Sequence, residues 1–212
     1  RDWSSDVCSS DLGGPAEVSF GGENLSWGPA RRYPILLGNS APGFAHVRVG
    51  TRKPVNVGIG ALDVDLLWGR LDESPQFDTV TGNDHRLLTG FFAQLDLRGL
   101  EGLSLGVAGV QHNRWTEAKA KWLNLYTFPF NEGQHTEGNG LVSVTATWRL
   151  EESRADVYAE WARDDYWTDL GDLLREPDHT QGYLLGLEKL VRHGTSRSEE
   201  HTLNSSHGYI SY

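Results

Sequence analysis

Apolar and polar residues alternate along the second half of the chain, as they do in β-strands with one apolar and one polar face. Between Leu87 and Leu97 the odd-numbered residues form the apolar face, whereas Gln94 and Asp96 lie on the other face. Residues 181–192 form a further expected strand with a less regular pattern. The clearest two-residue periods predict strands over residues 87–97, 103–112, 139–150 and 154–163.

An earlier strand is expected over residues 62–68. Its even-numbered residues are apolar, and Asp63 and Asp65 lie on its polar face. Apolar residues at positions 55, 57 and 59 have the opposite phase. Gly58 and Gly60 lie where the phase changes, and glycine at such a point indicates a bulge or a turn.

The lengths of the connections predict how the strands are arranged. The short connections are residues 98–102 and 151–153, and the long polar ones are residues 72–86, 113–138 and 164–180. Because short and long connections alternate, an up-and-down antiparallel sheet would have its tight turns at one end and its long loops at the other. This asymmetry, with strands of about ten residues, is typical of an outer-membrane β-barrel whose polar face lines the lumen. Tryptophans at positions 68, 148 and 161 lie on the apolar faces, as an interfacial aromatic girdle would.

We therefore expect an all-β fold, an antiparallel up-and-down sheet that is an incomplete fragment of a transmembrane outer-membrane β-barrel. A soluble β-sandwich or a lipocalin-like barrel also has alternating strands and stays an alternative. The long strands, the one-sided long loops and the absence of any cysteine other than Cys8 favour the membrane barrel.

The composition excludes several other classes of protein. The 212 residues include 19 Lys+Arg and 29 Asp+Glu, a net charge of −10. A nucleic-acid-binding protein needs a basic surface, so we expect no nucleic-acid partner. At 38% hydrophobic residues the chain has enough apolar side chains for a folded structure. No apolar run reaches the roughly 18 residues of a transmembrane helix.

Both ends of the chain resemble translated sequencing-library adapter. The oligonucleotide AGATCGGAAGAG encodes Arg-Ser-Glu-Glu, the sequence of residues 197–200. Its reverse complement, read one base out of frame, encodes Ser-Ser-Asp-Leu, the sequence of residues 9–12. We therefore expect residues 1–12 and 197–212 to be artefacts outside the core, and residues 13–196 to be the partial barrel.

Five motifs between Glu23 and Tyr183 occur in the order known from one protein family. They are ENLSWGP (residues 23–29), NSAPGFAH (39–46), WGRL (68–71), AEWARDD (159–165) and LREPDHTQGY (174–183). In these motifs the chain resembles the Wzi family of capsule-assembly proteins. Family members are much longer, which makes this chain less than half of their barrel, and Gly22 stands where the family has arginine.

The resemblance implies an outer-membrane protein that binds capsular or extracellular polysaccharide and helps to assemble or anchor capsule at the cell surface. It implies a lectin rather than an enzyme, without a cofactor. Its partners would be the polysaccharide and outer-membrane lipid, and the full-length barrel would be monomeric.

A polysaccharide site needs planar aromatic rings for sugar faces and fixed polar groups for hydroxyls, and arginine pairs well with sugar carboxylates. For each candidate a structural role is the alternative: packing for the tryptophan, hydrogen bonds within loops for the histidines, and a lumen salt bridge between Glu160 and Arg163. The candidate residues are Trp27, Arg32, His46, Glu160, Arg163, Asp164, Glu176 and His179.

Other chemistry has weaker support in the sequence. Asp63 and Asp65 lie about 7 Å apart on one strand face, a carboxylate pair of the kind that glycosidases use. No metal-ligand, phosphate-loop or nucleophile motif occurs, so we expect no catalytic residue and no metal site. A general porin or solute channel stays an alternative function, as does, less strongly, a barrel hydrolase.

Overall fold

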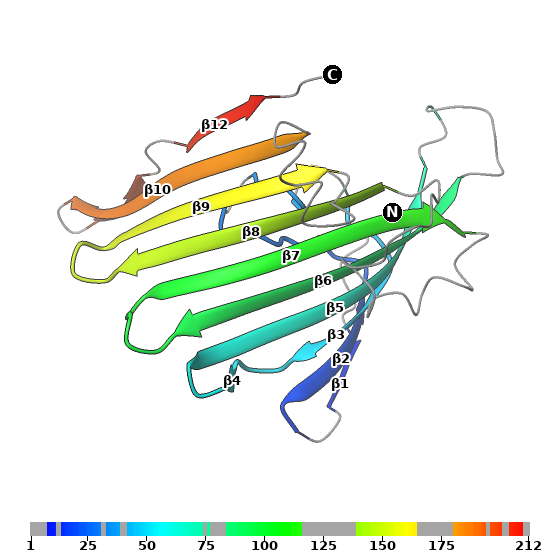
Figure 1. Cartoon of the computed structure of the whole chain (residues 1–212), viewed down its shortest axis with the longest axis horizontal. Coiled ribbons are helices and arrows are strands. Elements are labelled where there is room, and N and C mark those ends of the chain that lie inside the picture. Colours follow the sequence, from blue (N-terminus) through cyan, green and yellow to red (C-terminus); the bar gives the residue numbers. More distant parts are fainter. Residues whose placement is uncertain are drawn as a thin grey trace, which may run out of the picture.

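The structure, a computed structural model of the chain, is a single antiparallel sheet of twelve strands (Figure 1). Its described residues are 8–11, 14–30, 33–38, 42–73, 76, 84–115, 139–164, 180–193, 196–200 and 204–209. Within these ranges there is no helix of the length and apolar character needed to cross a membrane.

The centre of the sheet is a run of six strands that lie side by side in chain order. These are β5 (Gly60–Asp72), β6 (His85–Leu97), β7 (Leu103–Arg114), β8 (Asn139–Leu150), β9 (Ala155–Asp164) and β10 (Gln181–His193). On one side the sheet continues with β3 (His46–Thr51) and β2 (Ala16–Gly21). The expected all-β, up-and-down antiparallel sheet is therefore confirmed, and so are its two central hairpins, β6–β7 and β8–β9.

Tight turns and long connections lie at opposite ends of the sheet. Residues 98–102 and 151–154 close the two central hairpins at the left of Figure 1. The ends of β5, β7 and β9 that lead into the long connections lie at the right. Gly99 and Gly102 have φ angles of 89° and 82°, a left-handed conformation that glycine adopts without steric cost. Glycine at these two positions therefore favours the tight turn between β6 and β7.

A second tight turn explains the change of phase before β5. The short strand β4 (Val55–Asn56) pairs with the beginning of β5. Between them the Val57 N–H donates a hydrogen bond to the Gly60 carbonyl at 2.9 Å, and Gly58 has a φ of 86°. A bulge or a turn was expected at Gly58 and Gly60, and the structure has a turn there.

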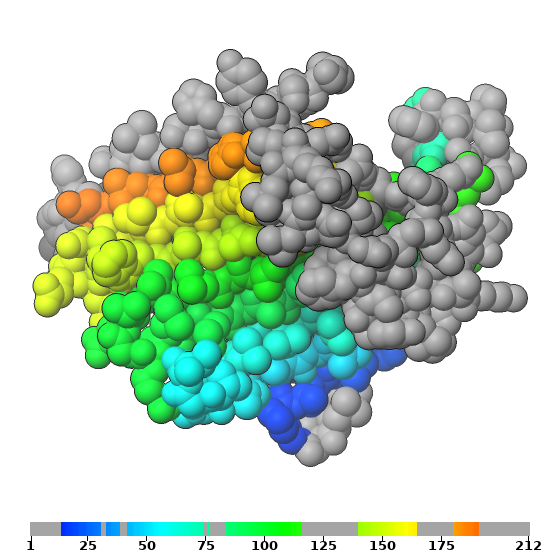
Figure 2. Space-filling model, viewed as in Figure 1, coloured from blue at the N-terminus to red at the C-terminus, as the bar shows by residue number. Residues whose placement is uncertain are grey.

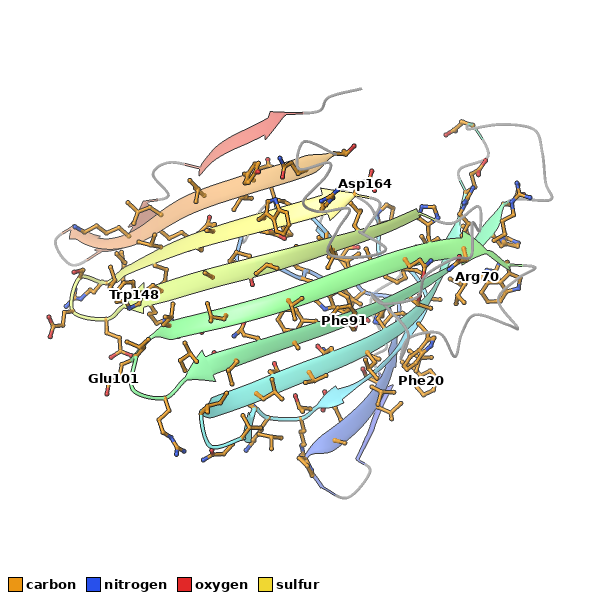
Figure 3. All side chains as sticks on the ribbon, in the orientation of Figure 1. Phe20, Arg70, Phe91, Glu101, Trp148 and Asp164 are labelled. Carbon is orange, nitrogen blue, oxygen red and sulfur yellow. The ribbon has the colours of Figure 1, made fainter. Side chains whose placement is uncertain are left out.

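The outer face of the sheet is apolar and exposed. Trp148 and Leu185 keep 50% and 61% of their surface accessible, and Figure 3 labels Phe91 and Trp148 on this face. In the space-filling view the strands from β5 to β10 form one continuous surface (Figure 2). The exposed apolar residues that the register places on this face are Phe20, Leu105, Val107, Val144, Trp148, Val157, Tyr183, Leu185 and Leu187.

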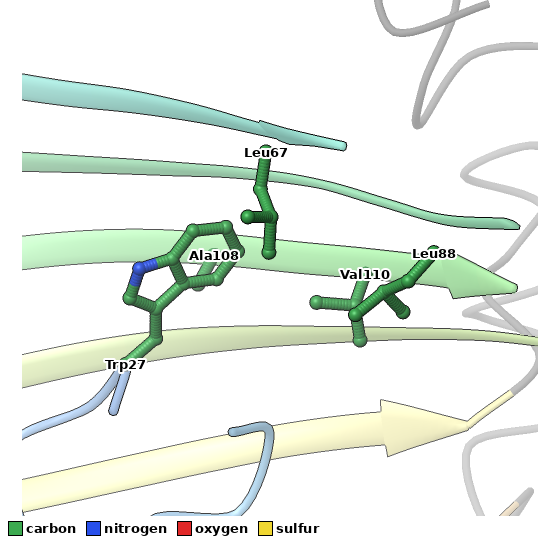
Figure 4. Packing of buried hydrophobic residues seen from close by; sticks show 5 residues of the cluster. All are labelled: Trp27, Leu67, Leu88, Ala108 and Val110. Carbon is green, nitrogen blue, oxygen red and sulfur yellow. The ribbon is translucent and has the colours of Figure 1, made fainter. Parts of the chain in front are cut away.

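The inner face is mixed in character and is covered by the chain itself. The described residues between β2 and β3 lie behind the sheet in Figure 1. We call the described part of this stretch, residues 22–30, 33–38 and 42–45, the inner segment. Its Trp27 packs on the inner-face residues of three strands, and the cluster comprises Trp27, Leu67, Leu88, Ala108 and Val110 (Figure 4).

The inner segment reaches across most of the sheet. Trp27 lies over β5 to β7, whereas Ala30 and Ile35 form a second cluster with Tyr158 of β9 and Leu184 of β10. The Trp27 N–H donates to the Leu37 carbonyl at 3.2 Å and joins the two arms of the segment. The main core therefore lies between the inner segment and the inner face of the sheet.

The two terminal stretches pair at the sides of the sheet. β1 (Cys8–Asp11) pairs with β2, and both β11 (Ser196–Glu200) and β12 (Asn204–Tyr209) pair with β10. Among the described strands β1 and β11 stand at opposite ends of the pairing order and do not pair with each other, so the sheet is open. Whether residues 1–12 and 197–212 contribute to the core stays a prediction.

Candidate functional site

Glu160 lies at the centre of the contact between the inner segment and the sheet. On β9 it stands between Thr145 and Leu184 in register, on the inner face, and only 2% of its surface is exposed. Its Oε2 accepts a hydrogen bond from the backbone N–H of Ile35 at 3.2 Å. A buried carboxylate needs such a donor, because an unpartnered buried charge is strongly unfavourable. Glu160 therefore fixes the inner segment to β9.

Gly28 makes room for this carboxylate. Its φ is 126°, and a Cβ at this position would lie 3.0 Å from Glu160 Oε2. Only glycine combines this backbone conformation with so close an approach. The tryptophan and the glycine of the motif at residues 23–29 thus contact the sheet at neighbouring points, Trp27 over β5 to β7 and Gly28 over β9.

Trp27 has the packing role that was the alternative to a sugar-binding role. Its ring stacks on Phe92 with centroids 6.0 Å apart, and it is almost fully buried. A Cβ at Gly90 would lie 2.8 Å from the Trp27 ring, so a glycine in β6 lets the indole approach the strand. In this arrangement Trp27 offers no ring face to a ligand.

His46 joins the two ends of the inner segment. Its Nδ1 donates to the Phe44 carbonyl at 2.8 Å, because a carbonyl oxygen can only accept. Its Nε2 lies 3.5 Å from Glu23 Oε1, at the other end of the segment. The ring is buried on the inner side of β3. His46 therefore has the structural role that was the alternative to polysaccharide binding.

Arg163 and Glu160 lie on opposite faces of the sheet. Arg163 pairs in register with Val142 and Gln181, on the side of the apolar outer face. Asp164 follows it at the loop end of β9, on the inner side with Glu160. Arg163 was expected to point to the lumen or to its loop end, and it lies near the loop end of β9. Strand alternation places it on the face opposite Glu160, the residue with which a lumen salt bridge was the structural alternative. Arg163 is nonetheless buried.

The three remaining candidates, Arg32, Glu176 and His179, lie outside the described residues.

A second polar cluster lies on the inner face of β2, β3 and β5. Arg48 Nη2 lies 2.6 Å from Glu17 Oε1, and Arg48 Nε lies 3.6 Å from Asp65 Oδ1. Asp63, the other carboxylate of the proposed glycosidase pair, accepts a hydrogen bond from Thr51. Both aspartates thus have partners within the sheet. The signal for Arg48 was its polar position between Val47 and Val49, which alternation places on the inner face.

A third group, which the sequence analysis did not single out, lies where β5, β6 and β7 meet the long connections. Asp72 Oδ1 accepts a hydrogen bond from Arg70 Nε at 2.8 Å and lies 2.8 Å from His85 Nδ1. The Arg70 guanidinium also lies over the ring of Trp115, 5.9 Å from its centroid. These four side chains are exposed, and Arg70 is labelled in Figure 3. These residues become neighbours only through the pairing of β5 with β6, so the sequence could indicate the group only if the strand register were known.

Groups of three or more potential metal ligands do not occur in the part of the chain that the structure describes. Comparison of the chain with protein-family models, with curated proteins and with solved structures found no match. The geometry of the sheet and its inner segment therefore carries the functional argument.

Proposed function

We propose that the chain is part of the wall of an outer-membrane β-barrel that binds capsular polysaccharide and helps to hold capsule at the cell surface. The observation that carries the first half of this proposal is the exposed apolar outer face. A soluble protein rarely exposes so large an apolar surface, whereas the wall of a membrane barrel faces lipid with such a surface. This distribution favours a barrel wall over a soluble sandwich.

The length and direction of the strands agree with this role. The central strands have 10 to 13 residues, and about 9–11 residues of a tilted strand cross a bilayer. Long connections gather at one end and tight turns at the other, the arrangement in which long loops face the cell exterior. The open sheet would be completed by further strands in the intact barrel.

The polysaccharide part of the proposal rests on the motifs shared with the Wzi family. The geometry supports this part of the proposal because residues of two of these motifs are in contact. Gly28, from residues 23–29, and Glu160, from residues 159–165, are in close contact although they lie far apart in sequence. A general porin is the second candidate. The inner segment, which occupies the inner face from β5 to β10, is less compatible with an open diffusion channel.

The membrane assignment is tested by tryptophan fluorescence in vesicles of brominated phospholipid. In a variant that keeps only Trp148, on the outer face, we expect the bromine atoms to quench the emission strongly. A matched variant that keeps only Trp27, inside the core, should be quenched much less. Equal quenching of both tryptophans, or of neither, would contradict the placement of the outer face in lipid.

The binding assignment is tested with the same vesicles. We expect them to retain fluorescently labelled acidic polysaccharide during sedimentation and to resist swelling in solutions of small sugars. Vesicles without protein are the control for retention, and vesicles with a known porin are the control for swelling. Rapid swelling without retention would identify a porin instead.

A further inference from the structure

We propose that the turns β4–β5 and β6–β7 anchor the protein in the periplasmic leaflet of the outer membrane, where their apolar side chains enter the headgroup region and their cations bind anionic phospholipid. We call this group, Lys53, Val57, Ile59, Arg98 and Leu100, the turn anchor. The inference rests on the proposed function, because it takes the outer face to contact lipid, and it adds the place and the chemistry of a specific lipid contact.

The first observation is the exposure of apolar side chains at the tips of these turns. Val57, Ile59 and Leu100 keep 43%, 67% and 54% of their surface accessible, and all three lie in turns between strands. Turns that face water are usually built from polar residues and glycine. The β8–β9 turn, residues 151–154, reads Glu-Glu-Ser-Arg and has that ordinary composition. Apolar tips are therefore a particular property of the other two turns.

The second observation is that hydrogen bonds hold the two turns side by side. The Arg98 N–H donates to the Ile59 carbonyl at 2.9 Å, and Arg98 Nη2 donates to Asn56 Oδ1 at 3.1 Å. The same Asn56 oxygen accepts the Gly58 N–H at 3.0 Å. Both turns lie at the left of Figure 1, and Glu101 in Figure 3 marks the second one. The apolar tips therefore form one fixed surface.

The third observation is the length of the apolar outer face along β5. Its outward apolar residues cover only residues 62–68, because Arg70 and Asp72 follow on the same face and are exposed. A tilted strand needs about 9–11 residues to cross a bilayer. Counted back from Trp68, that length begins at about residues 58–60, in the β4–β5 turn. The strand therefore spans the bilayer only if this turn lies at the membrane surface.

The neighbouring strands give the same boundary. Thr89 of β6 stands opposite Trp68 of β5, and Gln111 of β7 stands opposite Thr89. The same length of about 9–11 residues, counted from Thr89 and Gln111, ends at about residues 97–99 and 101–103. Leu100 lies between these two limits, so the β6–β7 turn reaches the same membrane surface.

The charge of the two turns is opposite to that of the whole chain. The net charge of the chain is −10, whereas the turns and the residues flanking them carry three cations and one anion, all exposed: Arg52, Lys53, Arg98 and Glu101. Asp63 and Asp96, in the adjoining strands, lie on the inner face and accept hydrogen bonds from Thr51 and Ser104. Apolar side chains flanked by cations are the composition that binds an anionic lipid surface.

Continuity with the outer face indicates lipid rather than a protein partner. Leu97 and Leu103 are the last outward residues before the β6–β7 turn, and Trp148 stands beside Leu103 in register. Trp148 is half exposed, as an interfacial tryptophan would be. No polar row separates these residues from the turn tips, in contrast to the loop end of β5. The surface that covers the outer face therefore also reaches the turn anchor.

The test of depth uses an NBD fluorophore on a single cysteine of the full chain, with Cys8→Ser, in vesicles that contain nitroxide-labelled phospholipid. In Ile59→Cys we expect a nitroxide near the headgroup to quench the label more than a nitroxide near the end of the acyl chain. Glu152→Cys, at the tip of the polar β8–β9 turn, is the matched control and should be quenched much less. Trp148→Cys, on the outer face, is the positive control.

The test of charge titrates short-chain phosphatidylglycerol, with phosphatidylcholine as the neutral comparison, into the Ile59→Cys labelled chain in a neutral detergent. Phosphatidylglycerol should bind more tightly, and Arg98→Gln should weaken its binding roughly fivefold. Arg154→Gln removes the same charge in the β8–β9 turn and should leave the binding unchanged. Heat-modifiability on gels verifies that each variant folds, and Lys53→Gln replaces Arg98→Gln if the latter does not.

Weak quenching at position 59, equal to that at position 152, with strong quenching at position 148 would overturn the turn anchor and leave the membrane assignment intact. Absence of quenching at all three positions would overturn both. Shielding of position 59 that depends on protein concentration and not on lipid would identify a contact between copies and also overturn the anchor. Equal binding of the two phospholipids would overturn the role of the cations.

Discussion

At the scale of single residues, the contact of Gly28 with Glu160 is the most constrained point of the molecule. Glycine is required there by a left-handed φ of 126° and by the carboxylate next to its Cα. The carboxylate in turn accepts the Ile35 N–H. A side chain at position 28 would therefore disturb both the backbone and the hydrogen bond that fixes the inner segment.

Gly28→Ala should lower the free energy of unfolding by about 1–3 kcal/mol, because alanine is strained in this backbone conformation and crowds Glu160. Urea titration of the detergent-solubilised chain, followed by tryptophan fluorescence, measures the change. Gly22→Ala is the matched control, since a Cβ there has no atom within 4 Å. Equal stability of the two variants would show that Gly28 does not constrain the inner segment.

Trp27→Ala should cost about 3–5 kcal/mol, the usual range for removing a large aromatic side chain from a core. Trp148→Ala, at an exposed position, should change the stability in detergent by much less. The same urea titration compares them. If both substitutions had the same small effect, Trp27 would not be the anchor that its burial indicates.

At the scale of elements, the strands could be predicted from the sequence and the inner segment could not. The strand predictions succeeded because each depends on a local period of two residues, as for residues 87–97, which the structure extends only to His85–Leu97. The inner segment has no such period. Its position follows from contacts with residues more than a hundred positions away, such as the hydrogen bond from Ile35 to Glu160. Sequence pattern alone does not report contacts of that kind.

The candidate site was predictable only in part, for a related reason. Glu160 was expected on the polar face by alternation, and it lies there. Arg163 lies at the strand end, where the side chain could point to the lumen or to the loop, and alternation places it on the face opposite Glu160. The contacts of Asp72 depend on the register between strands, since Asp72 and His85 become neighbours only when β5 and β6 are aligned.

The hairpin turn between β8 and β9 offers a prediction about local conformation. Arg154 is the one non-glycine residue with a positive φ, 51°, among the described residues. Its backbone N–H bonds to Glu151 and its carbonyl accepts from Leu190, and neither bond needs the side chain. Arg154→Gly should therefore raise the free energy of unfolding by up to about 1 kcal/mol. Gly99→Ala in the other turn should lower it, and a stability loss in Arg154→Gly would contradict the conformational argument.

At the scale of the whole molecule, the exposed apolar outer face and the two open sides of the sheet determine how the protein behaves in solution. The outer face exposes apolar side chains to the surroundings, and the sides present unpaired strand edges, which favour association between copies. Among the described strands, the terminal stretches β1, β11 and β12 lie at these sides. We therefore expect the chain to aggregate without detergent.

Removal of residues 1–12 and 197–212 should leave the heat-modifiability and the urea midpoint of the detergent-solubilised chain nearly unchanged. The reason is that the two core clusters are built from residues between Leu25 and Leu184. Loss of the folded form after this truncation would show that the terminal strands are needed. Sequencing the source locus through both ends would test their adapter-like origin directly.

The inner segment also has a consequence for the order in which the protein assembles. The central hairpins close over turns of a few residues, so they can form as soon as their strands are synthesised. The hydrogen bond from Ile35 to Glu160 instead joins residues 125 positions apart and must await β9. The surface that Trp27 covers, on β5 to β7, is complete earlier, whereas Ala30 and Ile35 have no surface to cover before β9 and β10 are in place. Docking of the inner segment is therefore completed late, and its second arm remains uncovered until the last strands of the sheet have formed.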